Sequence, residues 1–205
     1  MQKGERLNAV SHLIGTVAAV VGAAALIVGA AMQGDTLKLV SFSIYGASLV
    51  TLYLSSTLYH SLSGRAKAFF QKLDHSSIYV LIAGTYTPFS LVAMRGALGW
   101  FYFGMIWSLA ALGIAIEAVS HEKKRIIPVL LYLTMGWLAV LVVRPLINTL
   151  SASGFAWLLA GGLLYTIGVV FYISGSRTTY GHGIWHLFVL GGSACQFVAV
   201  LLYVL

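Results

Sequence analysis

The feature that most constrains this chain is a series of apolar runs, each long enough to cross the hydrocarbon core of a bilayer as a helix. A bilayer-crossing helix needs about 20 predominantly apolar residues. The sequence contains seven such runs, at 9–32, 39–61, 75–94, 98–119, 126–148, 154–174 and 183–204. They lack the two-residue alternation of outer-membrane strands and are about twice too long for them. We therefore predict an all-α integral membrane protein, with residues 1–205 forming a single domain of seven transmembrane helices.

Composition excludes several other classes of protein. With 60% hydrophobic and 8% charged residues, the chain has too many apolar side chains to bury in one water-soluble core. The net charge of +7 would suggest nucleic-acid binding in a soluble domain, but the cations lie in short gaps between apolar runs, where they act as topology signals and phospholipid contacts. The single cysteine, Cys195, rules out a disulfide framework and a cysteine-based metal site.

The distribution of Lys and Arg predicts the orientation in the membrane. Nine cations lie at the N-terminus and in the gaps after the second, fourth and sixth runs: Lys3, Arg6, Arg65, Lys67, Lys72, Lys123, Lys124, Arg125 and Arg177. Three lie on the opposite side: Lys38, Arg95 and Arg144. Because cytoplasmic loops carry the excess of Lys and Arg, we expect a cytoplasmic N-terminus and an external C-terminus. The first run is longer than a signal-peptide core and is interpreted as a retained helix.

Ionisable side chains within membrane spans are costly, so their positions are informative. His60 ends the second run at its cytoplasmic side, and Ser56 lies one turn earlier on the same face. Asp74 opens the third run at that same side. The last run begins at the cytoplasm with HGIWH, which places His182 at the membrane edge and His186 about 6 Å deeper. Five polar side chains from three helices are therefore expected in one inner layer.

This layer has the composition of a catalytic zinc site. Three neutral imidazoles suit Zn²⁺ and leave a fourth position for water, which Asp74 could hold or deprotonate. Each residue alone has a simpler explanation: a helix-end histidine at the lipid headgroups, or an aspartate that caps a helix at the amides of Ser76 or Ser77. For the whole set we favour the metal site, because those explanations do not predict a shared depth.

Other polar residues carry weaker signals. His12 either lines the mouth of this site or belongs to a polar helix start. His75 points about 100° away from Asp74 and is interpreted as a rim residue. Glu117 is expected to pair with a loop cation. Pro88 should kink the third helix, and Thr85 or Thr87 could bond to the freed backbone carbonyl.

Four stretches, ERLNAVSHLIG, SSTLYH, LDHSSIYVLIAGTYTPF and HGIWH, resemble the hemolysin III family, the bacterial branch of the progestin and adipoQ receptor group. The resemblance extends over essentially the whole chain and implies a seven-helix bundle in the bacterial cytoplasmic (inner) membrane, with Zn²⁺ near the cytoplasmic face. By motif match, His60, His182 and His186 would be the metal ligands. Asp74 would hold the water bound to the metal, and Ser56 would lie beside it. The wider superfamily includes alkaline ceramidases, which hydrolyse a lipid amide.

The sequence is compatible with three functions. The first is a zinc-dependent hydrolase of a membrane-lipid amide or ester, in which Asp74 accepts a proton and Ser56 orients the water or steadies the oxyanion. The second is a non-enzymatic membrane-homeostasis regulator or lipid sensor, in which direct coordination by Asp74 completes a structural zinc site. A pore is ranked last, because the outer halves of the runs are nearly uncharged.

Overall fold

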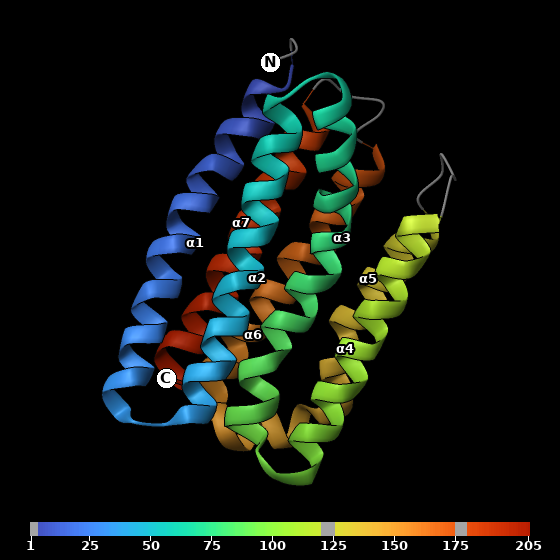
Figure 1. Cartoon of the computed structure of the whole chain (residues 1–205). Coiled ribbons are helices and arrows are strands. Elements are labelled where there is room, and N and C mark those ends of the chain that lie inside the picture. Colours follow the sequence, from blue (N-terminus) through green and yellow to red (C-terminus); the bar gives the residue numbers. More distant parts are fainter. Residues whose placement is uncertain (1–3, 120–125, 175–179) are drawn as a thin grey trace.

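The computed structural model describes residues 4–119, 126–174 and 180–205, and every regular element in these ranges is helical, which confirms the all-α prediction. In chain order, the elements are α1 (Arg6–Gln33), α2 (Thr36–Ser61), α3 (Gly64–Pro88), η1 (Phe89–Met94), α4 (Gly96–Val119), α5 (Ile126–Trp137), η2 (Leu138–Val142), α6 (Val143–Ser174) and α7 (Gly181–Tyr203). Segment η1 is a π-helix and η2 a 3-10 helix. The helices form one elongated bundle, with the N- and C-termini at opposite ends (Figure 1).

The outer surface of this bundle is apolar. Six helical stretches within the described residues are long and apolar enough to cross a membrane. On α1, for example, Val17, Val21 and Met32 are all exposed. Such a surface suits contact with lipid, and the chain is a multi-pass membrane protein. Five of the cations used to predict its orientation lie outside the described residues: Lys3, Lys123, Lys124, Arg125 and Arg177.

One of the six stretches folds back on itself. It extends over Ile126–Ile173, which is 48 residues. Trp137 Nε1 donates a hydrogen bond to Thr166 Oγ1 over 3.1 Å, whereas an uninterrupted helix would separate these two residues by about 43 Å. The helix is interrupted by η2 and by Ser151, whose φ of 62° and ψ of 170° are not helical. The stretch therefore consists of two limbs that lie side by side.

A tight turn joins α1 to α2. Gly34 ends α1 in the left-handed conformation, with φ 67°, and its N–H bonds to the carbonyl of Ala31. Asp35 then caps α2, because its side chain accepts hydrogen bonds from the backbone N–H groups of Leu37 and Lys38. The two helices form an antiparallel hairpin, which brings the start of α1 beside the end of α2 (Figure 1).

Helix α3 begins earlier than the sequence predicted. The cations between residues 64 and 73 interrupt the apolar pattern, so the expected start was residue 75. The helix instead begins at Gly64 and runs through this mostly exposed, charged segment before it enters the apolar region. Asp74 therefore lies well inside the helix. The interpretation of Asp74 as a helix cap for Ser76 or Ser77 is wrong for this reason.

Helix α3 ends at Pro88, and the wider turns of η1 follow. Proline has no N–H, so the carbonyl of Gly84 loses its helical partner. Thr87 Oγ1 donates to the carbonyl of Ala83 over 2.9 Å and accepts a hydrogen bond from Trp107 Nε1. Thr87 thus bonds to the carbonyl adjacent to the freed one, which differs in detail from the expected arrangement.

Small residues seven positions apart bring α2 and α3 close together. Ser55 Oγ lies 3.3 Å from Ser77 Oγ. Two turns further along, Ser48 faces Gly84, where an added Cβ would lie 2.2 Å from Ser48 Oγ. Helix α3, with η1, is also the most enclosed stretch, since 67% of its most apolar window is buried. This seam fixes the end of α2, which carries His60, against the part of α3 that carries Asp74.

Candidate metal centre

Three imidazoles from two helices meet at one end of the bundle. His60 lies in the last turn of α2, and His182 and His186 lie in the first two turns of α7. The ring centroid of His60 is 5.2 Å from that of His182 and 4.9 Å from that of His186, and the latter two are 4.7 Å apart. One ring nitrogen from each histidine lies within 4.8 Å of the other two. The structure therefore brings together the three histidines that the sequence analysis proposed as metal ligands.

The spacing of two of these nitrogens is compatible with a shared metal ion. His182 Nε2 lies 3.2 Å from His186 Nε2, and two nitrogens on a tetrahedral Zn²⁺ with ordinary bond lengths are about 3.3 Å apart. His60 Nε2 is buried and has no hydrogen-bond partner among the described residues. Within those residues, Asp74 is not part of the three-histidine donor group. Three nitrogen donors of this kind leave one position of a tetrahedral ion open.

The start of α1 orients two of the rings. Glu5 Oε2 lies 2.5 Å from His60 Nδ1, and the backbone carbonyl of Asn8 lies 3.2 Å from His186 Nδ1. An acceptor at Nδ1 favours the tautomer that carries its proton there, which leaves the Nε2 lone pair free for a metal. Both rings are therefore held with Nε2 as the available ligand atom.

Glu5 is also the centre of a small charged network. Lys67 Nζ, from the charged start of α3, lies 3.0 Å from Glu5 Oε1, and Asn8 Nδ2 donates to Glu5 Oε2 over 2.9 Å. Partial burial raises the pKa of the Glu5 carboxyl, but the hydrogen bonds from Asn8, Lys67 and His60 outweigh it and lower this pKa to about 2. The carboxylate is therefore ionised at neutral pH and is a permanent acceptor for His60.

The sequence places Glu5 and Asn8 near His12 but predicts no role for either of them at the site. A signal was present: Glu5, Asn8 and His12 are spaced by three and four residues, which places them on one face of a helix. His12 lies on that face and is buried, with 2% of its surface exposed. Its ring stacks on that of His186 with centroids 3.6 Å apart. His12 is thus buried beside the proposed metal ligands.

Asp74 and Ser56 are both buried at this end of the bundle. Asp74 is 7% exposed, and its backbone carbonyl accepts a hydrogen bond from Ser77 Oγ. Ser56 lies one helical turn before His60, and its Oγ is buried without a hydrogen-bond partner among the described residues. Burial of a carboxyl group and a hydroxyl group in a lipid-facing helical protein is unusual, because moving polar groups away from water costs free energy.

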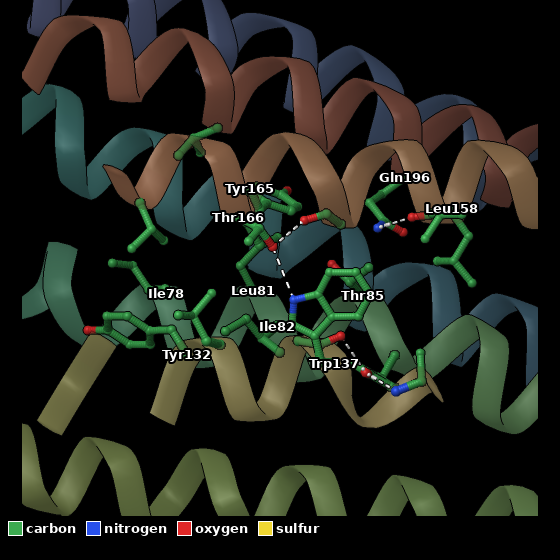
Figure 2. A pocket seen from close by; sticks show the side chains of 18 of the residues that line it. Ile78, Leu81, Ile82, Thr85, Tyr132, Trp137, Leu158, Tyr165, Thr166 and Gln196 are labelled. Carbon is green, nitrogen blue, oxygen red and sulfur yellow. Dashed lines mark hydrogen bonds between the residues drawn. The ribbon is translucent and has the colours of Figure 1, made fainter. Parts of the chain in front are cut away.

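An apolar cavity of about 190 Å³ extends from this layer into the bundle. Its walls come mainly from α3, η1, α5, η2, α6 and α7. Figure 2 shows Ile78, Leu81 and Ile82 on one wall and Tyr132 and Trp137 on another. His12 and Asp74 line the same cavity, whereas His60, His182 and His186 are not among its described lining residues. The fold-back of residues 126–173 builds much of this wall, which the apolar pattern alone does not reveal.

A partly buried ionisable pair begins at His75, the residue after Asp74 on α3. His75 Nδ1 is 3.1 Å from Glu117 Oε1 on α4, and Tyr132 OH on α5 donates to the backbone carbonyl of His75. The side chain of His75 is 16% exposed and that of Glu117 is 9% exposed. Glu117 therefore contacts His75, and the loop cations expected to pair with it lie outside the described residues. The contacts of His75 fasten α3 to α4 and α5.

Comparison with known proteins identifies the family. Residues 2–197 match the family model described as Haemolysin-III related. The chain is 44% identical to Hemolysin-3 of Bacillus cereus over 99% of its length and 93% of the relative's. It is 45% identical to the Hemolysin-3 homolog of Bacillus subtilis over 98% and 94% of the respective lengths.

A more distant relative is the human Monocyte to macrophage differentiation factor, which is 33% identical over 84% of this chain and 74% of the relative. That protein is a member of the progestin and adipoQ receptor group, so the similarity extends to the wider group inferred from the sequence. On these grounds, the chain belongs to the haemolysin III family.

Proposed function

We propose that this protein is a zinc-dependent hydrolase that cleaves an amide or ester bond of a membrane lipid. The observation that carries the proposal is the set of three imidazoles in which two Nδ1 atoms face fixed acceptors, leaving Nε2 atoms for the metal. The adjoining apolar cavity supports a ligand with a hydrocarbon chain.

The proposed setting is the bacterial cytoplasmic membrane, crossed seven times, with a cytoplasmic N-terminus and the metal centre near the cytoplasmic face. Three observations support this arrangement. The cations are unevenly distributed along the sequence. The Ile126–Ile173 stretch folds back and is long enough for two crossings. The termini lie at opposite ends of the bundle, as an odd number of crossings requires (Figure 1).

The residues have separate roles in the proposed reaction. His60, His182 and His186 would hold the ion. A bound Zn²⁺ would lower the pKa of its water to about 7 and polarise the carbonyl group of the lipid. Asp74 would accept the proton of the attacking water and return it to the leaving amine or alcohol. Ser56 would orient the water or donate a hydrogen bond to the developing oxyanion. The acyl chain would occupy the cavity, away from water.

The decisive experiment compares Asp74→Asn with the unchanged protein, both purified with their metal. We expect the variant to retain zinc, because the three imidazoles supply the donors, and to lose at least about 100-fold in turnover of a lipid amide or ester, as removal of a general base typically does. Metal content is measured by mass spectrometry and turnover by release of fatty acid. Ser76→Ala, on the same helix, is the matched control and should keep both properties. Full activity in Asp74→Asn would exclude the assigned proton acceptor.

A non-enzymatic role in membrane homeostasis is the second candidate. It is supported by the position of the donors, since a metal bound there would fasten α2 to α7, as a structural ion does. The two candidates differ in the fourth ligand. An Asp74 oxygen bound directly to zinc, at about 2.0–2.2 Å, would favour the structural role, whereas water in that position favours hydrolysis.

A further inference from the structure

His12 is a buried imidazole that the three-histidine donor set does not use. One face of its ring stacks on His186, with centroids 3.6 Å apart and an angle of 15° between the planes. Tyr53 packs edge-on against it at 5.1 Å. The side chain is 2% exposed, and neither Nδ1 nor Nε2 has a hydrogen-bond partner among the described residues.

Packing alone does not account for a histidine at this position. A phenyl ring would stack on His186 and Tyr53 equally well, without burying two polar nitrogens that cost free energy when they lack a partner. Metal coordination does not account for it either. Within the described residues, the group of mutually close donor atoms contains His60, His182 and His186 but not His12.

His12 lies between the apolar cavity and the three-histidine set. Among the described residues, His12 is the one histidine that both lines the apolar cavity and touches a member of the metal-binding set. Asp74 lines the same cavity, from α3. Much of the remaining wall is apolar, with Ile78, Leu81 and Val189 as examples. A molecule in the cavity that carries one polar end would therefore meet His12 where the apolar wall ends and the metal centre begins.

We propose that His12 is a ligand-binding residue whose ring N–H donates a hydrogen bond to the acyl carbonyl oxygen of the lipid in the cavity. A neutral imidazole carries one N–H donor, so this contact needs no change in protonation. The hydrogen bond gives a buried nitrogen the partner that it lacks and places the carbonyl beside the metal centre. This inference rests on the proposed function for the identity of the ligand, but it concerns binding and does not require turnover.

The test measures binding of two radiolabelled probes to the purified, zinc-loaded protein: N-hexadecanoyl-ethanolamine, which has an amide carbonyl, and hexadecane, which has no hydrogen-bond acceptor. In His12→Phe, the ring stacking is kept and the nitrogens are removed. We expect a loss of about 10-fold in affinity for the amide, which is the size of one net hydrogen bond. Hexadecane affinity and zinc content should be unchanged. His12→Gln, which restores an N–H donor, should recover most of the affinity for the amide.

Controls separate this inference from its alternatives. His75→Phe removes a histidine that does not line the cavity and should leave the affinity for the amide unchanged. Unchanged amide binding in His12→Phe would overturn the proposal, as would loss of zinc from that variant, which would assign His12 to the metal site. If His12→Phe does not fold, the unchanged protein still decides, because equal affinity for the two probes would exclude a carbonyl contact. Binding of the amide through His12 without its hydrolysis would contradict the proposed enzyme but support this residue's role.

Discussion

The two carboxylate oxygens of Glu5 contact one residue on each of three helices. These residues are His60 at the end of α2, Lys67 at the start of α3 and Asn8 in α1. The contact with Asn8 is local, but those with His60 and Lys67 exist only after α1, α2 and α3 have packed together. In zinc proteins, a carboxylate behind a ligating histidine raises its basicity and fixes its ring. Glu5 has the position for this role.

We predict that Glu5→Gln lowers zinc affinity by roughly 10- to 100-fold, the usual effect of losing such a carboxylate. The amide keeps the size of the side chain but removes the charge, so the helices should still pack. Competition with a chromogenic chelator measures the affinity. Glu117→Gln is the matched control, since it removes an equal charge from a residue that contacts His75 instead of the proposed ligands. Equal zinc affinity in Glu5→Gln and the unchanged protein would contradict the orienting role of this carboxylate.

Individual residues also show how far the sequence determines the site. The depths of His60, His182 and His186 follow from helical rise and span boundaries, so their convergence could be predicted. The contacts of Glu5 with His60 and of His12 with His186 join residues 55 and 174 positions apart and depend on which helix faces which. Ion pairs and ring stacking of this kind leave no local sequence pattern, beyond the three- and four-residue spacing on α1.

The packing of α2 against α3 depends on a close approach of their backbones. Without a hydrophobic driving force between helices in lipid, packing of small residues supplies much of the association free energy. Ser48 and Gly84 form the tightest point of this seam, where an added Cβ at Gly84 would also lie 2.6 Å from Ser48 Cβ.

We predict that Gly84→Ala destabilises the protein by about 1–3 kcal/mol, because the new methyl group forces the helices apart. The loss should be partly recovered in the double variant Ser48→Gly with Gly84→Ala, which moves the small residue to the other helix. Thermal unfolding in detergent measures the difference. Gly104→Ala on α4 is the control, because nothing lies within 4 Å of its added Cβ. Additive effects of the two seam substitutions would show that the helices do not meet at this point.

The start of α3 shows why the boundaries of a helix are harder to predict from sequence than its existence. Hydropathy marks where a helix enters the apolar region, and that point lies near residue 75. Hydrogen bonding continues the helix back to Gly64 through exposed residues such as Arg65 and Lys72, which are good helix formers. The break in α6 at Ser151, by contrast, could not be predicted from that residue, because it is neither a proline nor a glycine.

For the whole molecule, the number of crossings decides on which side each end lies. Seven crossings place the termini on opposite sides of the membrane, whereas six would place them on the same side. We predict that alkaline phosphatase fused after Leu205 is active in intact bacteria, because this enzyme folds only outside the cytoplasm. The same enzyme fused after Ser63, between α2 and α3, should be inactive and serves as the control. An inactive fusion after Leu205, together with an active one after Ser63, would mean that the orientation is inverted.

The three histidines, Glu5 and His12 all lie at one end of the bundle, and the opposite end holds none of this set. Lipid headgroups of only one of the two monolayers can reach them. A lipid molecule facing the other way would have to flip across the membrane first, which is slow for polar headgroups. Any action of this protein on lipids would therefore change the composition and area of one monolayer relative to the other, and so the curvature of the membrane around it.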